Sequence, residues 1–297
     1  MEQTLSPTIH NKGAVLSILD ESLFTGEQKP YRLLCTIDPE FISIAAVDPL
    51  KNKFSGFEGF HLAKPHSDEQ LAQKIAELPL QSTILKKVDF RNVSVQFTNN
   101  RFTFIPAAIF KAEDAEAYFN FNQPKRDDES LHYDTIRGYD AVNIFTVPDQ
   151  LITGCKKMFE KFNVHHHLTS LLDAARFHSQ KQSGKCMFIH LHSSSLDIIV
   201  LEERKLLFAN SFSNKSIEDG VYFVMMVCEQ LSLNTDKSTV ILSGEVEKET
   251  GLAKQLQQYI RHISFGERIR TASFTYGFDE LPPHYYHAAF SHILCES

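Results

Sequence analysis

The same order of predicted secondary-structure elements occurs twice along this chain. Three stretches rich in strand-forming residues are followed by a helix, a fourth strand and a second helix, first from about residue 33 and again from about residue 186. The polar stretch at residues 181–185 separates the two copies. Few residues are identical between them, so the match lies in the order and length of the elements. The strands of each copy are expected to form a sheet whose faces must be covered by helices. We therefore expect an α/β layer structure for each copy.

The first copy shows a clear helix between its strands. This helix is predicted to begin at the N-cap Ser67, to bury Leu71, Ile75 and Leu78 on one face, and to end at Pro79. A short strand is expected before residue 30. The other predicted elements are strands at residues 33–38, 41–47, 57–62 and 88–97, a helix at 112–119, a hairpin of 131–136 and 141–147 around Arg137 and Gly138, a helix at 149–159, a short strand from Val164 and a helix at 169–177.

The second copy repeats this pattern. Its predicted elements are strands at residues 186–192, 197–201, 205–212 and 238–242 and helices at 216–231, 250–260 and 284–294. We therefore expect two domains, an N-terminal lobe at residues 1–168 and a C-terminal lobe at residues 169–297. A chain of 297 residues is long enough for two such units.

Composition narrows the classes of function. The chain has 30 basic and 37 acidic residues, so no broad positive surface for nucleic acid is expected. Its N-terminus shows no signal peptide, and no uncharged apolar run reaches the roughly 18 residues that a membrane span needs. The five cysteines are widely spaced and form no CxxC motif, which indicates free thiols. These features predict a cytoplasmic protein with no nucleic-acid partner and no membrane span.

Three turns carry a resemblance to a known fold. Residues 188–199 (FIHLHSSSLDII) match, in length and flanking strands, the turn in which actin-like proteins place an acidic residue, a glycine, hydroxyl side chains and an aspartate. Residues 240–245 (VILSGE) resemble the strand and glycine-rich turn that cradle adenosine, and residues 37–42 (IDPEFI) resemble the matching turn of the first copy. From about residue 31 onward the chain resembles the actin-like ATPase fold of actin, sugar kinases and heat-shock chaperone ATPases.

This resemblance implies a fold class and a candidate site. The expected class is α/β, a duplicated ribonuclease-H-like (actin-like ATPase) fold with two lobes, each with a mixed sheet flanked by helices. The chain, including residues 102–108 (FTFIPAA), resembles a bacterial family of unknown function and is similar to the cytoplasmic actin-like proteins of type IV pilus assembly. The implied nucleotide-binding residues are Asp38, Ser193, Ser194, Ser195, Asp197 and Gly244, with ATP and Mg²⁺ as the implied ligands.

The phosphate-binding turns depart from the pattern of the fold. Pro39 stands where glycine is expected and removes a backbone donor. His192 and Glu245 stand at two further glycine positions, although phosphate turns need backbone N–H groups that approach the anion closely. His190 replaces the leading acid and is a poor ligand for Mg²⁺. The turn at residues 193–195 is either an anion-binding turn or an ordinary hairpin turn.

Three hypotheses of function follow. The preferred one is a non-catalytic scaffold or partner-binding module with no cofactor, no catalytic residue and a protein partner, whose identity and oligomeric state stay open. The alternative is a nucleotide-binding protein with weak or no ATP hydrolysis in the cleft between the lobes. The third, a metal-dependent enzyme of ribonuclease-H type, needs converging carboxylates, and only isolated ones are visible. No P-loop, G-x-G-x-x-G or G-x-S-x-G motif occurs.

Histidines form two further patterns. His165 and His167 are expected to share one face of a strand, as are His190 and His192 on another strand. Four converging imidazoles suit Zn²⁺. No cysteine or carboxylate stands at ligand spacing beside either pair, so the preferred interpretation is ordinary polar strand residues without a metal site. His284 and His287 are expected on a solvated helix face.

Overall fold

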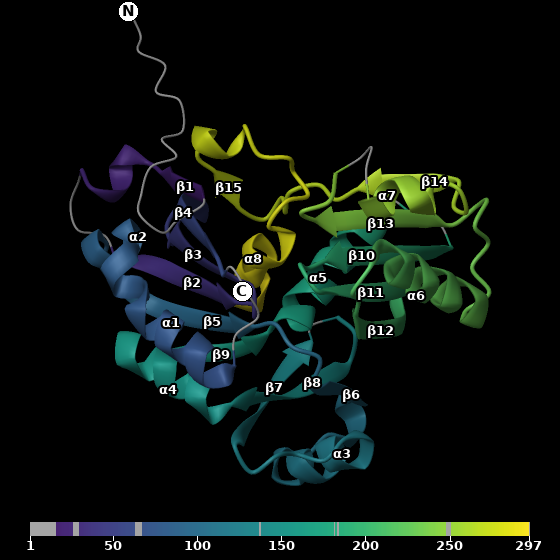
Figure 1. The fold of residues 1–297 in the computed structure, drawn as a ribbon, viewed down its shortest axis with the longest axis horizontal. Helices are drawn as coiled ribbons and strands as arrows, with labels where there is room; N and C mark the ends of the chain where they lie inside the picture. The colour runs from purple at the N-terminus through teal and green to yellow at the C-terminus, as the bar shows by residue number, and fades with distance from the viewer. Residues whose placement is uncertain are drawn as a thin grey trace, which may run out of the picture.

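The computed structural model describes residues 16–25, 30–62, 67–136, 138–180, 182, 184–247 and 251–296. The N-terminal stretch, where no signal peptide is predicted, lies outside the described residues. So do Arg137 of the predicted hairpin turn and two residues of the polar stretch between the copies, Lys181 and Ser183. The described residues form two large mixed sheets, one small sheet and the helices that cover them (Figure 1).

The first large sheet contains the strands of the first copy. Its order is β1-β4-β3-β2-β5-β9, with β15 beside β4. The strands are β1 (Leu16–Leu19), β2 (Tyr31–Ile37), β3 (Phe41–Asp48), β4 (Lys53–His61), β5 (Phe90–Phe97), β9 (Asn163–His166) and β15 (Ser273–Phe274). The apolar run Leu33-Leu34-Cys35 is buried along its whole length, as in strands covered on both faces.

The second large sheet repeats the core of the first. Its order is β12-β11-β10-β13-β14, with β10 (Lys185–Leu191), β11 (Ser195–Glu202), β12 (Lys205–Ser213), β13 (Thr239–Gly244) and β14 (His262–Phe265). In both sheets the first strand of the copy is central, runs antiparallel to the second and is parallel to the fourth. The third strand adds antiparallel to the second, and the fifth adds parallel to the fourth. The repeated element order in the sequence is therefore a repeated sheet topology.

A small third sheet is inserted in the first copy. It has the order β6-β8-β7, with β6 (Phe102–Pro106), β7 (Glu129–Ile136) and β8 (Ala141–Pro148). The predicted hairpin forms β7 and β8, whereas β6 has no counterpart among the predicted strands. Helix α3 (Ala115–Asn122) packs on this sheet through the buried Phe119, and the unit projects from the rest of the molecule in Figure 1.

The helices α1 (Asp68–Gln81), α2 (Thr83–Lys87) and α4 (Asp149–Met158) cover one face of the first sheet. As predicted, Ser67 caps α1, and Leu71, Ile75 and Leu78 are buried. The predicted end at Pro79 is wrong, because α1 continues to Gln81. A proline in the last turn removes one hydrogen bond and still leaves room for the final residues.

Helices α6 (Ile217–Gln230) and α7 (Gly251–Leu256) cover one face of the second sheet. The remaining helices are exchanged between the copies. Helix α5 (His167–Ser179), which follows the first sheet in the chain, packs through Leu171 and Ala175 on the second sheet. Helix α8 (His287–Ser291), which follows the second sheet, packs through Ala289 and Phe290 on the first.

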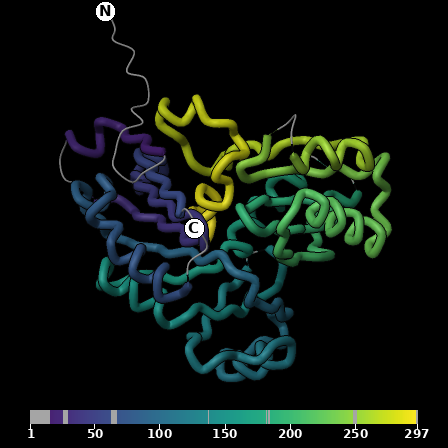
Figure 2. Tube along the Cα trace, in the orientation of Figure 1, coloured from purple at the N-terminus to yellow at the C-terminus, as the bar shows by residue number. Residues whose placement is uncertain are grey.

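The C-terminal segment therefore returns to the first sheet, as the yellow part of Figure 2 shows. It includes β15 and the 3-10 helices at Tyr276–Phe278 and His292–Glu296, the last of which replaces the end of the predicted helix 284–294. The remaining 3-10 helices are Glu21–Leu23, Ala107–Ile109 and Ala112–Asp114. The division of the chain at residues 168 and 169 stays a prediction.

All five cysteines are free thiols. Within the described residues, no helix combines the length and apolarity that a membrane crossing requires.

Candidate functional site

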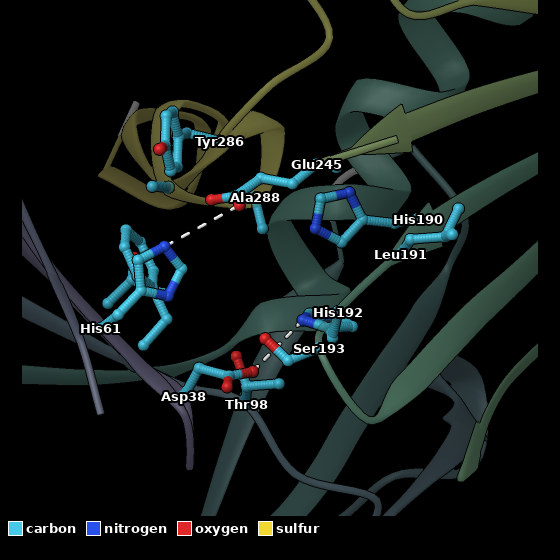
Figure 3. A pocket seen from close by; sticks show the side chains of 14 residues that line it. Asp38, His61, Thr98, His190, Leu191, His192, Ser193, Glu245, Tyr286 and Ala288 are labelled. Atoms are coloured by element: carbon cyan, nitrogen blue, oxygen red, sulfur yellow. Dashed lines mark ion pairs between the residues drawn. The ribbon is translucent and has the colours of Figure 1, made fainter. Parts of the chain in front are cut away.

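A cavity of about 300 Å³ lies between the two large sheets. Its walls come from the carboxyl ends of β2, β5, β10 and β13, and the start of α8 closes one side. The carboxyl ends of parallel strands are where ligands bind in α/β sheets, because the turns that follow can face a common space. The cavity is therefore the candidate site, and Figure 3 shows its side chains.

The imidazole of His192 lies between two carboxylates that come from different sheets. Its Nδ1 is 3.2 Å from Oδ2 of Asp38 at the end of β2, and its Nε2 is 2.7 Å from Oδ2 of Asp197 in β11. Asp197 is fully buried, and the side chain of His192 is only 8% exposed. The ring of His192 thus contacts a predicted nucleotide-binding residue from each of the two copies.

This contact determines the charge of the ring. Burial by itself lowers the pKa of His192, but the charge and the hydrogen bond of Asp197, together with those of Asp38, raise it to about 10. Burial by itself raises the pKa of Asp197, but the charges of His167 and His192 hold it well below its ordinary value. His192 and Asp197 form a buried ion pair at neutral pH.

A second imidazole reaches Asp197 from the start of α5. His167 is the first residue of this helix, and its Nε2 lies 3.2 Å from Oδ1 and 3.1 Å from Oδ2 of Asp197. Within the described part of the chain, Nδ1 of His167 has no hydrogen-bond partner. The prediction that His165 and His167 share a strand face is wrong, because β9 ends at His166 and the chain continues as a helix. His165 instead pairs with Asp134 at 2.9 Å.

Each of the three turns has a backbone donor that is engaged within the protein. The N–H of Glu40 donates to Oδ1 of Asp38 at 2.9 Å, and Pro39 has no N–H. The N–H of His192 donates to the carbonyl of Ser195 at 2.8 Å, and the N–H of Gly244 donates to the carbonyl of His284 at 2.9 Å. These groups are not available to a phosphate without rearrangement.

The structure brings some of the predicted site residues together and separates others. Asp38, Ser193 and Gly244 line the cavity. Asp197 lies behind His192 and is fully buried. Ser194 is in the turn beyond the lining residues, and Ser195 is the first residue of β11. Whether any of these residues binds a nucleotide stays a prediction.

Several lining residues are absent from the sequence-based candidates. Nε2 of His61 lies 3.8 Å from Oε2 of Glu245 across the cavity, from one large sheet to the other (Figure 3). The ring of Phe41 contacts those of His61 and Tyr286, with centroid separations of 4.9 and 5.4 Å. Glu245 stands out in the sequence because it occupies a glycine position, but nothing local marks Phe41, His61 or Tyr286.

His284 and His287 lie inside the protein, so the expected solvated face is wrong. They are 3% and 2% exposed. Nε2 of His287 lies 3.1 Å from Nε2 of His178 in α5, and its Nδ1 lies 3.1 Å from Oγ of Ser291. The cause is the return of α8 to the space between the sheets, which places both faces of this short segment against other elements.

This burial predicts a pH-dependent stability. Burial and the neighbouring His178 lower the pKa of His287 to about 3, whereas an unfolded histidine titrates near 6.5. Below pH 6.5 the unfolded state takes up a proton that the folded state does not, so stability falls as pH falls. From pH 8 to pH 5 this group alone is expected to cost about 2 kcal/mol of unfolding free energy.

Urea unfolding at several pH values measures this effect. His287→Gln is expected to reduce the loss between pH 8 and pH 5 by about that amount, whatever its stability at pH 8. The exposed His262→Gln serves as the control and is expected to leave the pH dependence unchanged, because its side chain is solvated in both states. Equal pH dependence in wild type and His287→Gln contradicts the assignment.

Comparison with known proteins identifies the family of this chain. Residues 20–263 match the family DUF3822, whose description is "Protein of unknown function". The chain belongs to the DUF3822 family. No curated protein matches this DUF3822 chain.

Solved structures show the fold of this DUF3822 protein. It is similar to a protein from Bacteroides thetaiotaomicron described as having an actin-like ATPase fold and unknown function, with a TM-score of 0.71 and 22% identity over 83% of this chain and 93% of that one. It is also similar to a chain of the PilM–PilN type IV pilus biogenesis complex, with a TM-score of 0.66 and 11% identity over 91% of this chain and 100% of that one. The predicted fold, a duplicated ribonuclease-H-like fold of actin-like type, is confirmed.

Proposed function

We propose that this DUF3822 protein is a non-catalytic member of the actin-like fold that serves as a scaffold or partner-binding module. The observation that supports this most directly is the position of the His192 ring. It fills the space between Asp38 and Asp197, where the turns of the two copies approach each other. A phosphate group held by both turns needs that space.

The charges around the cavity support the same proposal. Its lining includes the acidic side chains of Asp38 and Glu245 and, among the described residues, no lysine or arginine. A triphosphate brings several negative charges and is normally met by lysine, arginine, Mg²⁺ and free N–H groups. With Asp38 already bonded to His192 and Glu40, the residues present do not fit a nucleotide with its metal ion.

A protein partner is the second part of the proposal. The similar PilM chain was solved in a complex with PilN, so this fold is compatible with binding another protein. At 11% identity this likeness concerns the fold alone, and we place no partner on a particular surface.

The alternative function is nucleotide binding with weak or no hydrolysis. One observation favours it. Three of the predicted nucleotide-binding residues, Asp38, Ser193 and Gly244, line one cavity between the sheets. Opening of the His61–Glu245 contact across this cavity would give the nucleotide access.

Isothermal titration calorimetry with ATP and Mg²⁺ distinguishes the two functions. We expect no binding up to millimolar ATP, for the wild type and for Glu245→Gln alike, because His192 blocks the space in both. Binding with a micromolar dissociation constant contradicts the non-catalytic proposal and supports the alternative. The same samples, assayed for phosphate release, are expected to show no turnover above the rate of ATP alone.

A further inference from the structure

Three side chains beside the cavity offer metal-binding atoms to one point. His167, His192 and Asp197 each place a ring nitrogen or carboxylate oxygen within 4.8 Å of those of the other two. They come from the first residue of α5, the residue after β10 and the third residue of β11, so only the tertiary fold brings them together. The two histidine pairs of the sequence each contribute one member, and Asp197 supplies the carboxylate that neither pair has beside it.

Two of the three distances between the candidate ligand atoms are close to those of a tetrahedral site, and all three are within 4.8 Å. With metal–ligand distances of about 2.0–2.1 Å, neighbouring ligand atoms of a tetrahedral zinc site lie about 3.3 Å apart. Here Oδ2 of Asp197 is 2.7 Å from Nε2 of His192 and 3.1 Å from Nε2 of His167. The 2.7 Å contact between Asp197 and His192 lengthens by about 0.6 Å in such a site.

The charge of the cluster favours a divalent cation. Asp197 is fully buried and Asp38 is 8% exposed, and both contact the ring of His192. In the part of the chain that the structure describes, their ion-pair partners are histidines, with no lysine or arginine among them. A divalent cation that takes the place of the Nε2 proton of His192 balances the charge of both carboxylates, which reduces the cost of burying them.

Asp38 is placed to orient His192 for this role. Metal-binding histidines usually donate their second ring N–H to a carboxylate, which fixes the ring and its tautomer. The contact of 3.2 Å between Oδ2 of Asp38 and Nδ1 of His192 has this form and leaves Nε2 directed at Asp197. His167 lacks such a partner within the described residues, so its ring is held less firmly.

We propose that Nε2 of His167, Nε2 of His192 and the carboxylate of Asp197 bind a divalent transition metal ion of the zinc class, which displaces the Nε2 proton of His192 to solvent, with Asp38 as the positioning residue. Two imidazoles and one carboxylate favour Zn²⁺ or Co²⁺ over Mg²⁺ and Ca²⁺, which prefer oxygen ligands. His192 lines the cavity, which provides the path of entry. This proposal goes beyond the proposed function, and the ring of His192 still separates the two turns when the ion is bound.

The test is titration of the chelator-treated chain of 297 residues with ZnCl₂, followed by calorimetry. We expect one Zn²⁺ per chain with a dissociation constant below about 1 µM, and no binding of Mg²⁺ at millimolar concentration. CoCl₂ is expected to give the strong visible absorption of four-coordinate Co²⁺. Wild-type protein that binds neither ion, or that binds Mg²⁺ as tightly as Zn²⁺, overturns the proposal.

Variants identify the ligands. His167→Ala and His192→Gln are each expected to weaken Zn²⁺ binding at least 100-fold, and Asp38→Asn about 10–100-fold. His61→Ala changes a residue that lines the same cavity outside the cluster. It is the matched control and is expected to bind Zn²⁺ as the wild type does.

If a ligand variant fails to fold, the Co²⁺ spectrum of the wild type decides the proposal. Unchanged Zn²⁺ affinity in folded ligand variants overturns it. Zn²⁺ binding and ATP binding are measured in separate titrations, so failure of this proposal is distinguishable from failure of the proposed function.

Discussion

Replacement of Gly244 by alanine is expected to destabilise the protein by about 3 kcal/mol or more. Gly244 has a φ of +93°, and a Cβ at this position lies 2.2 Å from the carbonyl oxygen of Leu191. The alanine variant therefore combines backbone strain with a clash against the backbone of the adjacent strand, which a rotamer change cannot relieve. Urea unfolding measures the loss as a lower transition midpoint with an unchanged slope.

Gly184→Ala is the matched control for this prediction. Gly184 also has a positive φ, +74°, but no atom lies within 4 Å of a Cβ built there. The Gly184→Ala variant is expected to lose only about 1 kcal/mol of unfolding free energy, because backbone strain is its only cost. Equal losses in the two variants would mean that the close approach to Leu191 has no energetic role. The expected result assigns Gly244 a packing role that does not depend on any ligand.

Asp197→Asn is expected to destabilise the metal-free protein by about 3–5 kcal/mol. Asp197 is fully buried and accepts contacts from His167 and His192, so the neutral amide leaves the charge of His192 with Asp38 as its remaining carboxylate. A buried charge that loses its partner is costly because it is not returned to water. Urea unfolding at pH 7 in the presence of a chelator measures the change.

The control for this experiment is Asp236→Asn. Asp236 is exposed, so the same chemical change is expected to alter the unfolding free energy by no more than about 0.5 kcal/mol. A loss below 1 kcal/mol for Asp197→Asn would contradict the assignment of a buried ion pair. The two substitutions remove the same charge and differ only in burial and partners.

Local patterns account for the part of the fold that could be predicted. Apolar runs and helix caps depend on neighbours in the chain, and they identify β2, β3, β10, β11 and the start of α1. The short strands β14 and β15 have no such pattern, because four and two residues cannot show a period and their pairing partners are distant in sequence. The exchange of α5 and α8 between the sheets is likewise invisible to local patterns.

The candidate site also has features that could be predicted from the sequence and features that could not. The repeated order of elements, the actin-like resemblance and the replacement of the expected glycines by His192, Pro39 and Glu245 can all be seen in the sequence. The position of the His192 ring between Asp38 and Asp197, and the contact of His167 with Asp197, can be seen only in the folded chain. Secondary structure follows from interactions within a few residues, whereas these contacts join two sheets and a helix that meet only after the chain has folded.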